Sequence, residues 1–373
     1  MRILVINWRD INHPEAGGAE VHFQETFTRI VAAGHHVTLL CSRVSGAAEH
    51  EWIDGIEVIR NGGNFTFNLT VPGFYRSRLA DADFDLIIEY HNKIPFFLPA
   101  LVKDRPILVL VQHLFGAPVF RETNPVFASY VYLAERIIPY VYGSCAFEVI
   151  SESTMAELKG MGIPSGQMEV VHCGIGRDLF SQVDALGEKS GMSVIYLGRL
   201  KRYKNVDRLI RAMKSVHVEM PDARLSIVGD GDHSKALKML SAKLGLENII
   251  TFTGSVSDAE KIRLLRHADV AAFPSDKEGW GLSVIEANAC HTPVVATDVP
   301  GLRDAVVNQE TGILTPLGDT AALADALIRL LKDDTLRIQM AQKAADRATG
   351  FTWDLTAGRT LNIIERVVKS YKK

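Results

Sequence analysis

Two series of short, continuous apolar runs organise this sequence, and longer amphipathic stretches fill the gaps between them. The first series is RILVIN (2–7), HVTLL (36–40), DLIIEY (85–90), ILVLVQ (107–112) and FEVIS (147–151). The second is SVIYLG (193–198), RLSIVG (224–229), IITFTG (249–254), DVAAFP (269–274) and PVVAT (293–297). Continuous apolar strands alternating with helical patterns, such as 19–33 and 126–142, are typical of parallel sheets covered by helices on both faces.

The repeated series predicts two doubly wound, Rossmann-like α/β domains in tandem. A chain of 373 residues exceeds the usual size of a single core. We expect one domain over 1–172, a polar, glycine-bearing linker over 173–191 and a second domain over 192–353. The helical segment 354–373 follows no further strand, so it must pack on a domain already built. Ligands bind beyond the carboxyl ends of parallel strands, so the cleft between two facing domains is the expected site.

The charge is divided unevenly between the two halves. Residues 1–172 carry 13 basic and 19 acidic side chains, a balance of −6, and the rest carries 28 and 25, a balance of +3. The second half is therefore the better host for an anionic ligand. The net charge of −3 gives no reason to expect a nucleic-acid partner.

The four cysteines, Cys41, Cys145, Cys173 and Cys290, are far apart in sequence and show no metal-ligand or disulfide spacing. Reduced thiols and no metal site are expected. The first residues, MRILVINW, form too short an apolar run for a signal peptide, and no run is long enough to span a bilayer. A cytoplasmic protein is expected, either free or peripheral to the inner face of the cell membrane.

The stretch SDKEGWGLSVIEANA (275–289) combines two carboxylates with two glycines at the expected start of a helix. Ser283 and Glu286 have the S-x-x-E spacing of a capping box, which would give both residues a structural role. The same helix start would offer free N–H groups to a phosphate, and Gly279 and Gly281 would let a ligand approach the backbone. Glu278 and Glu286 would then accept hydrogen bonds from vicinal hydroxyls. Both interpretations of Glu286 remain open on spacing alone.

A basic loop follows the first strand of the second series, in LGRLKRYKNVDRLI (197–210). Arg199, Lys201, Arg202 and Lys204 crowd the carboxyl end of that strand. Such a loop is often only a solvated surface. Its place at a strand end favours a phosphate-binding role for one or two of these side chains.

Several other strand ends carry weaker signals. Gly17 and Gly18 lie between the first strand and its helix but lack the full dinucleotide-binding fingerprint, and GDGD (229–232) is a similar glycine pair. His113 follows the run 107–112, where it is either a structural histidine or a group facing a ligand. His91 and Asn92 end the run 85–90 in the same way. No nucleophile elbow, phosphate-binding P-loop or metal-spaced histidine pair occurs.

Together these motifs resemble the retaining glycosyltransferases of family 4, which have the GT-B fold. The matching pieces come in the family's order over nearly the whole chain: GGAE, GRLKRYKNVDRLI, VGDG, FTGSV, EGWGLSVIEANACHTPVVATDVPGLRDAV and ETGILTP. The resemblance implies two Rossmann-like domains facing across a cleft. It also implies that the C-terminal helix, 354–373, crosses back onto the first domain.

The resemblance implies a role for each candidate residue. Arg199 and Lys204 would bind the donor diphosphate, Glu286 the ribose and Glu278 the transferred sugar. Backbone N–H groups of Trp280, Gly281, Leu282 and Ser283, beside Gly279, would lie close to sugar and phosphate. Gly229 and Val256, in the VGDG and FTGSV turns, would hold the base. Gly17 and Gly18 would let the first domain approach the diphosphate, and His113 would lie by the reacting sugar. His91 and Asn92 are the candidates on the acceptor side.

Three positions depart from the family pattern. His291 in ACHT and Asn205 after the basic loop stand where glycine is usual, and Trp280 stands where phenylalanine is common. None of these departures removes a charged group from the expected site.

The implied reaction moves a hexose from a nucleotide diphosphate sugar to a hydroxyl of a glycan, a lipid-linked saccharide or a small glycoside. Anomeric configuration would be retained, and cations and helix N-termini would replace a metal in stabilising the leaving diphosphate. Family frequency favours a UDP-sugar, with GDP-mannose next. The alternatives on the same architecture are a sugar-nucleotide epimerase, a phosphorylase, or a binding protein without catalysis.

Two stretches could contact a lipid acceptor. VPGFYRSRL (71–79) mixes aromatic and basic residues, and VFASYVYLAERIIPYVYG (126–143) is rich in aromatic residues. For the second stretch a buried core helix is the preferred interpretation.

Overall fold

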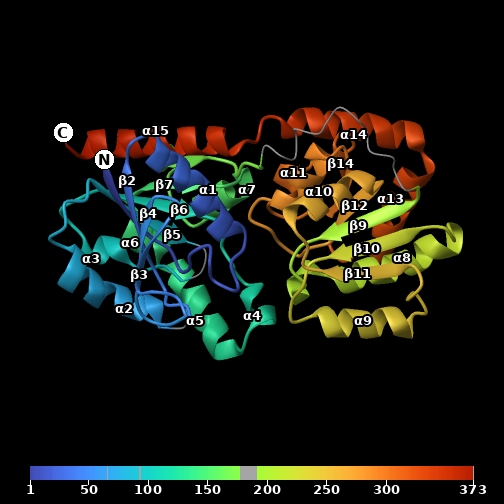
Figure 1. The fold of residues 1–373 in the computed structure, drawn as a ribbon, viewed down its shortest axis with the longest axis horizontal. Helices are drawn as coiled ribbons and strands as arrows, with labels where there is room; N and C mark the ends of the chain where they lie inside the picture. The colour runs from blue at the N-terminus through green and yellow to red at the C-terminus, as the bar shows by residue number, and fades with distance from the viewer. Residues whose placement is uncertain (65, 92–93, 177–190, 373) are drawn as a thin grey trace. The chain divides into compact units, whose positions relative to one another are not determined.

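The computed structural model describes residues 1–64, 66–91, 94–176 and 191–372, with only the backbone at 121 and 122. These residues form two compact units (Figure 1). Unit 1 comprises Met1–Gly174 and Trp353–Lys373, and unit 2 comprises Ile175–Thr352. The expected boundaries at 172 and 353 fall beside these divisions, and most of the expected linker, 177–190, lies outside the described residues.

The sheet of unit 1 has eight strands in the order β3-β4-β2-β1-β5-β6-β7-β8. All neighbouring strands are parallel except the hairpin of β3 and β4 at one edge. The strands are β1 (Arg2–Ile6), β2 (His36–Cys41), β3 (His50–Ile53), β4 (Ile56–Arg60), β5 (Leu86–His91), β6 (Ile107–Val111), β7 (Ala146–Val149) and β8 (Met168–Val170). Five of them lie on the runs read from the sequence.

Helices cover both faces of this sheet, because successive residues of each buried strand point to opposite sides. Leu4 and Ile6 of β1 pack into one apolar core, and Ile3 and Val5 pack into the other. The first core is covered by α2 (Phe67–Phe74), the π-helix η1 (Tyr75–Leu79), α3 (Leu98–Leu101), α4 (Val119–Glu122), α5 (Pro125–Arg136), α6 (Ile138–Tyr142) and α7 (Glu152–Gly160). The second is covered by α1 (Gly18–Ala32) and α15 (Trp353–Tyr371).

Helix α15 joins unit 1 although it follows unit 2 in the chain. It packs along α1 (Figure 1), and Arg29 Nε donates to Asp354 Oδ1 at 2.8 Å. Ile363, Ile364 and Val368 complete the second core. The segment assigned to a crossing helix from the family resemblance is therefore an integral part of the first unit.

Beneath α15 lies a buried carboxyl group, Glu148 of β7. Thr360 Oγ1 donates to its Oε1 at 3.0 Å, and Oε2 has no hydrogen-bond partner in the described structure. Burial raises the pKa of Glu148 to about 8. The opposite effect occurs at His22 of α1, where burial lowers the pKa to about 3.

Unit 2 contains a fully parallel sheet with the strand order β11-β10-β9-β12-β13-β14. The strands are β9 (Ser193–Leu197), β10 (Arg224–Val228), β11 (Ile250–Gly254), β12 (Val270–Phe273), β13 (Val294–Thr297) and β14 (Gly312–Thr315). The helices are α8 (Val206–Glu219), α9 (Ser234–Lys243), α10 (Asp258–His267), α11 (Leu282–Ala289), α12 (Leu302–Ala305), α13 (Thr320–Lys332) and α14 (Asp334–Ala348). The doubly wound α/β prediction is thus confirmed in both units.

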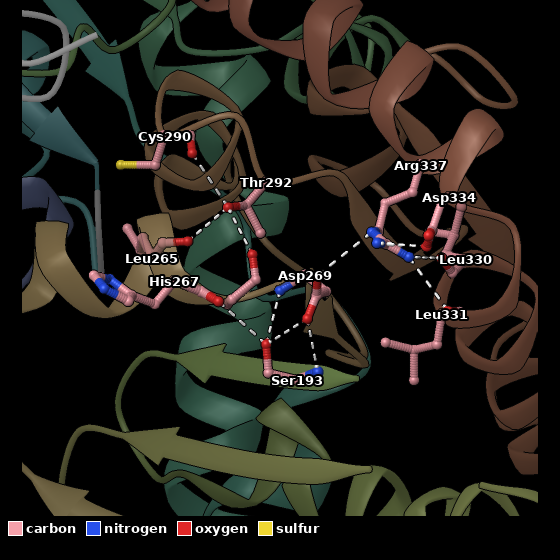
Figure 2. Close-up of polar contacts among 11 residues, drawn as sticks. Ser193, Leu265, His267, Asp269, Cys290, Thr292, Leu330, Leu331, Asp334 and Arg337 are labelled. Carbon is pink, nitrogen blue, oxygen red and sulfur yellow. Dashed lines mark hydrogen bonds and ion pairs between the residues drawn. The ribbon is translucent and has the colours of Figure 1, made fainter. Parts of the chain in front are cut away.

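A polar knot fixes the amino ends of the central strands of unit 2 (Figure 2). The buried Asp269 carboxylate accepts hydrogen bonds from the Ser193 N–H and hydroxyl, at 2.9 and 2.8 Å. Arg337 of α14 lies 3.5 Å from the same carboxylate and pairs with Asp334 at 2.7 Å. These contacts join the start of β9 to the residue that precedes β12.

All four cysteines are buried free thiols. The described ranges contain no cluster of three or more His, Cys, Asp or Glu side chains suited to a metal ion. Among those residues, no helix combines the length and the hydropathy needed to cross a bilayer.

Candidate functional site

Two loops meet at the carboxyl edge of the unit 2 sheet. One loop follows β9 and includes the short 3-10 turn Arg202–Lys204, and the other runs from the end of β12 to α11. Asn205 Nδ2 lies 3.0 Å from the Pro274 carbonyl oxygen and 2.6 Å from Asp276 Oδ1. The Asp276 N–H also donates to the Tyr203 carbonyl at 2.8 Å. The basic loop and the glutamate loop are therefore bonded into one unit.

At their junction Lys204 pairs with Glu278. The Lys204 Nζ lies 2.5 Å from Glu278 Oε1, and the Ser275 hydroxyl donates to the same oxygen at 2.7 Å. Both charged side chains are largely buried, with 16% and 17% exposed. Burial alone would lower the pKa of the Lys204 ammonium, but the adjacent Glu278 carboxylate raises it overall. Lys204 thus stays positively charged, and beside it lies the Glu278 carboxylate, which can accept hydrogen bonds from hydroxyl groups.

The second glutamate, Glu286, pairs with a lysine that the sequence did not single out. Lys261 Nζ of α10 donates to Glu286 Oε1 at 2.8 Å and lies 2.9 Å from Asp258 Oδ1. Burial opposes the positive charge of Lys261, but these two carboxylates raise its pKa. Lys261 therefore connects Glu286 to the start of α10, directly after the loop that contains Val256.

The expected capping box is wrong. The residue that precedes α11 is Gly281, with φ 90° and ψ 50°, and Ser283 is already the second residue of the helix. Because Gly281 precedes the helix in a left-handed conformation, α11 begins two residues earlier than a cap at Ser283 would require. Glu286 is therefore too far from the start of the helix to accept a hydrogen bond from the capping residue. Glu286 therefore does not cap α11, and its side chain instead pairs with Lys261.

The start of α11 remains available for an anion. Within the described chain, the N–H groups of Leu282 and Ser283 have no acceptor, as is usual in the first turn of a helix. Arg199 is exposed, and its side chain makes no hydrogen bond or ion pair with another described residue. Free N–H groups at a positive dipole end, together with a solvated guanidinium, suit a phosphate.

A turn at Gly301 supports the glutamate loop from below. Gly301 has φ +80°, and a Cβ there would lie 2.3 Å from the Glu278 carbonyl oxygen. The Glu278 N–H donates to the Pro300 carbonyl at 3.2 Å. The adjacent Pro-Gly pair was the available sequence signal, because this backbone contact tolerates no side chain.

The other predicted residues of unit 2 lie around the same edge. Gly279 is in the glutamate loop, Gly229 follows β10, and the half-buried Val256 lies between β11 and α10. The indole of Trp280 is buried and packs against Phe351, with ring centroids 5.2 Å apart. Only the backbone of Trp280 is therefore left to contact a ligand at this edge.

The predicted residues of unit 1 have different environments. Gly17 precedes α1, and its N–H donates to Glu20 Oε2 at 2.8 Å. Gly18 is exposed, and a Cβ there would meet nothing within 4 Å. His113 is half-buried after β6, with its ring 4.7 Å from that of Phe115.

His91, proposed for the acceptor side, is 1% exposed. Its Nε2 lies 2.9 Å from Glu89 Oε1, and its ring packs edge-on against Tyr142. Glu89 also accepts hydrogen bonds from the Phe96 N–H and the Tyr142 hydroxyl. These contacts give His91 a role in holding the following loop, and Asn92 lies outside the described residues.

Two Rossmann-like units with a cation and hydroxyl-acceptor site at a strand edge define a GT-B architecture, and comparison with known proteins agrees. Residues 183–347 match the family model "Glycosyl transferases group 1", and residues 16–179 match "Glycosyltransferase Family 4". A phosphatidyl-myo-inositol mannosyltransferase of Mycobacterium leprae is 35% identical over 370 residues, which cover 96% of this chain and 95% of that protein.

Further relatives extend the match. A D-inositol 3-phosphate glycosyltransferase of Nocardioides sp. is 28% identical over 394 residues, covering 94% of this chain and 86% of that protein. The Anabaena protein HepE, solved in complex with UDP-glucose, has a TM-score of 0.76 with 19% identity and coverage of 99% and 100%. This chain therefore belongs to the family 4 glycosyltransferases and is a glycosyltransferase of the GT-B fold.

Proposed function

We propose that this glycosyltransferase moves a hexose from a nucleotide diphosphate sugar to an acceptor hydroxyl, with retention of anomeric configuration and without a metal ion. The observation that carries the proposal is the pairing of Lys204 with Glu278 at 2.5 Å, beside the open N-terminus of α11. This arrangement puts a cation, free N–H groups and a hydroxyl acceptor within one short stretch of structure.

Each group has a defined task in this reaction. The diphosphate gains negative charge as its bond to the anomeric carbon breaks, and Arg199, Lys204 and the first N–H groups of α11 stabilise that charge. Glu278 accepts hydrogen bonds from hydroxyls of the transferred sugar, and Glu286 accepts them from the ribose. No protein nucleophile is assigned. The leaving phosphate takes the proton of the acceptor hydroxyl, and the oxygen of that hydroxyl bonds to the anomeric carbon on the face from which the diphosphate departs.

Residues of unit 1 complete the proposed donor site. Gly18, at the start of α1, lets the diphosphate approach its backbone because no side chain occupies the space. His113 faces the reacting sugar in this proposal, and Gly229 and Val256 of unit 2 hold the base through their backbone. A UDP-sugar is the favoured donor, supported by the shared fold of HepE, which was solved with UDP-glucose. GDP-mannose is next, supported by the mannosyltransferase name of one relative.

The acceptor is proposed to be a hydroxyl of a glycan, a lipid-linked saccharide or a small glycoside, and we add inositol phosphates to these classes. The names of the relatives add a specific first choice, since both contain a phosphorylated inositol. Phosphatidylinositol and inositol 3-phosphate are therefore the first acceptors to test.

A thermal-shift panel of UDP, GDP, ADP and their hexose conjugates tests the donor. A ligand at 100 times its Kd adds about 2.7 kcal/mol to the free energy of unfolding, so the cognate nucleotide separates clearly from the others. The shift should be lost in Lys204→Met and kept in Lys201→Met. Lys201 lies in the same loop as Lys204, but its ammonium pairs with Asp232, which follows β10. Equal shifts in both variants would reject the site. Product anomeric configuration by proton NMR, with and without chelator, tests retention and metal independence.

A further inference from the structure

An arginine lies in the loop that follows β1, at the carboxyl edge of the parallel strands of unit 1. The Arg9 guanidinium donates through Nη2 to the Glu15 carboxylate and through Nη1 to the Glu15 carbonyl oxygen, at 3.0 Å for the second bond. Its remaining donor, Nε, is buried and has no hydrogen-bond partner in the described structure. Glu15 stands two residues before Gly17, so the guanidinium lies close to the glycine turn that opens α1.

The two partners of the Arg9–Glu15 pair have different environments. The Arg9 side chain is 13% exposed, whereas the Glu15 side chain is 59% exposed. An ion pair with an exposed partner contributes little to stability, because water and salt screen it. The Glu15 carboxylate can therefore turn into solvent at small cost, and this movement would uncover the Nη2 donor of Arg9.

Buried contacts fix the loop that carries the pair. The Asp10 carboxylate, 1% exposed, accepts a hydrogen bond from Arg60 Nε at 2.7 Å. His13 Nε2 lies 3.0 Å from Asn64 Oδ1, and His13 Nδ1 accepts from the Glu15 N–H at 3.0 Å. A buried ion pair costs desolvation energy, and its best-attested use is to select one conformation. The loop backbone around Arg9 is therefore built in advance of any ligand.

The chemistry of this site suits a phosphate. A guanidinium binds a phosphate or a carboxylate through the same planar pair of N–H donors, so the two anions compete for it. Residues 1–172 have an acidic balance of −6. An anionic ligand that approaches unit 1 therefore depends on a local cation, and Arg9 supplies one at the edge where ligands of parallel sheets bind.

We propose that Arg9 binds a phosphate ester carried by the acceptor, and that the Glu15 carboxylate occupies the guanidinium until this phosphate displaces it. The inference rests on the function proposed above, since it assigns Arg9 to the acceptor of that reaction. The site then selects phosphorylated polyols or sugars over their unphosphorylated forms, because only the phosphate can compete with Glu15. The phosphate comes either from a free monoester or from the diester of a lipid headgroup.

Calorimetric titration of the full chain tests the binding step without any transfer. The probes are inositol 3-phosphate, glycerophosphoinositol as the soluble headgroup diester, and unphosphorylated myo-inositol. A parallel series contains saturating UDP, which occupies the cations of unit 2. The wild-type protein should bind at least one of the two phosphate esters and bind it more tightly than myo-inositol. The preferred ester identifies the source of the phosphate.

Two variants should change this binding in opposite directions. Arg9→Gln should weaken binding of the preferred ester about 10- to 100-fold, the loss of charge-assisted hydrogen bonds. Glu15→Gln should strengthen it about two- to fivefold, since the competing carboxylate is gone. A purely structural ion pair would not produce opposite signs, because both variants would break the same contact. Urea unfolding confirms that each variant is folded.

Arg43 provides the matched control on the same unit. It follows the neighbouring strand β2 and pairs with an exposed glutamate, Glu49, at 2.6 Å, but its own side chain is 54% exposed. Arg43→Gln should bind the phosphate esters as the wild-type protein does. Equal binding by Arg9→Gln and Arg43→Gln would overturn the proposal, as would a wild-type protein that binds neither ester more tightly than myo-inositol.

Transfer kinetics distinguish this inference from the proposed function. Arg9→Gln should raise the KM for the preferred ester about tenfold or more and leave the donor KM unchanged. Predicted binding changes without any transfer to the ester would reject the proposed acceptor and retain the phosphate site. Weaker UDP binding by Arg9→Gln, with unchanged binding of the esters, would assign the guanidinium to the donor diphosphate and overturn the acceptor assignment.

Discussion

The Lys204 ammonium and the Glu278 carboxylate lie 2.5 Å apart although the two residues are 74 positions apart in the sequence. Each residue neutralises the other in a largely buried place, so neither can be changed without consequence for its partner. This relationship lets the structural and the catalytic contributions of the pair be separated.

Lys204→Met should lower transfer activity about 100- to 1000-fold, because it removes a cation from the leaving diphosphate. It should also lower the free energy of unfolding by about 1–3 kcal/mol, since the largely buried Glu278 carboxylate loses its counter-charge and keeps only the Ser275 hydroxyl. The double variant Lys204→Met/Glu278→Gln should regain most of that stability and none of the activity. Urea unfolding and a transfer assay measure the two effects. Recovery of activity in the double variant would show that the pair is only structural.

Lys261 is expected to position Glu286 for the donor ribose. Lys261→Met and Glu286→Gln should each raise the donor KM about tenfold, the loss of roughly one charge-assisted hydrogen bond, with a smaller change in kcat. Asp258→Asn is the control, because Asp258 contacts the same lysine from an exposed position. Steady-state kinetics with varied donor concentration measures the donor KM of each variant. An unchanged KM in both variants would show that the ion pair only joins α10 to α11 and does not contribute to donor binding.

Gly18→Ala should separate ligand approach from fold stability. Alanine has space at this position and favours a helix, so the free energy of unfolding should stay constant or rise by up to about 1 kcal/mol. Transfer activity should nevertheless fall, because the added methyl group occupies the path of the diphosphate. Gly358→Ala, at an exposed and open position in α15, should bring the same stability without loss of activity. Full activity in Gly18→Ala would remove this glycine from the donor site.

Glu148→Gln should make stability less dependent on pH. The folded protein holds the Glu148 proton up to a pKa of about 8, and an exposed glutamate in the unfolded chain releases it near 4.5. Because the folded state binds more protons in this range, wild-type stability falls as pH rises from about 4.5 to 8, by a few kcal/mol in order of magnitude. Urea unfolding between pH 6.5 and 9 avoids the range in which His22 contributes. Parallel curves for the two proteins would contradict the assignment.

Asn205 and His291 both occupy left-handed backbone positions, with φ of 51° and 54°. This conformation accounts for the glycine that is common at these places in the family motifs. His291→Gly should change the free energy of unfolding by less than about 1 kcal/mol, whereas His291→Val should cost a further 1–2 kcal/mol, roughly the strain of a left-handed residue. Asn205→Gly should be destabilising by about 1–3 kcal/mol despite its easier backbone, since the bonds to Pro274 and Asp276 are lost. Thermal or urea unfolding of the three variants checks the order.

The sequence predicted the strands best where both faces of a strand are buried. The runs at 107–112 and 269–274 contain β6 and β12, because a short continuous apolar run bounded by polar residues is typical of a buried parallel strand. The edge hairpin of β3 and β4 was missed, since its exposed face interrupts the apolar pattern. Family motifs brought Arg199, Lys204 and Glu278 to one edge of one sheet, as the structure has them.

Other features depended on information that local spacing does not hold. The capping box at Ser283 failed because the left-handed conformation of Gly281 moves the start of α11. Lys261 carries no local signal, since its partner Glu286 is 25 residues away and is brought close only by the packing of α10 beside α11. The stretch 126–143 was expected to be a buried core helix, but α5 exposes apolar side chains such as Val126 and Leu133. An apolar pattern cannot tell which of two apolar helix faces packs against the protein.

The return of α15 to unit 1 imposes an order on biosynthesis. The second core of unit 1 needs Ile363, Ile364 and Val368, and the ribosome must first complete the 178 residues of unit 2. At about 5–20 residues per second, roughly 10 to 40 seconds pass while α1 and one sheet face lack their cover. Unit 2 can therefore finish folding before the unit that precedes it. During that interval the nascent chain exposes the apolar surface that α15 later covers. A chaperone could bind this surface until α15 has been synthesised.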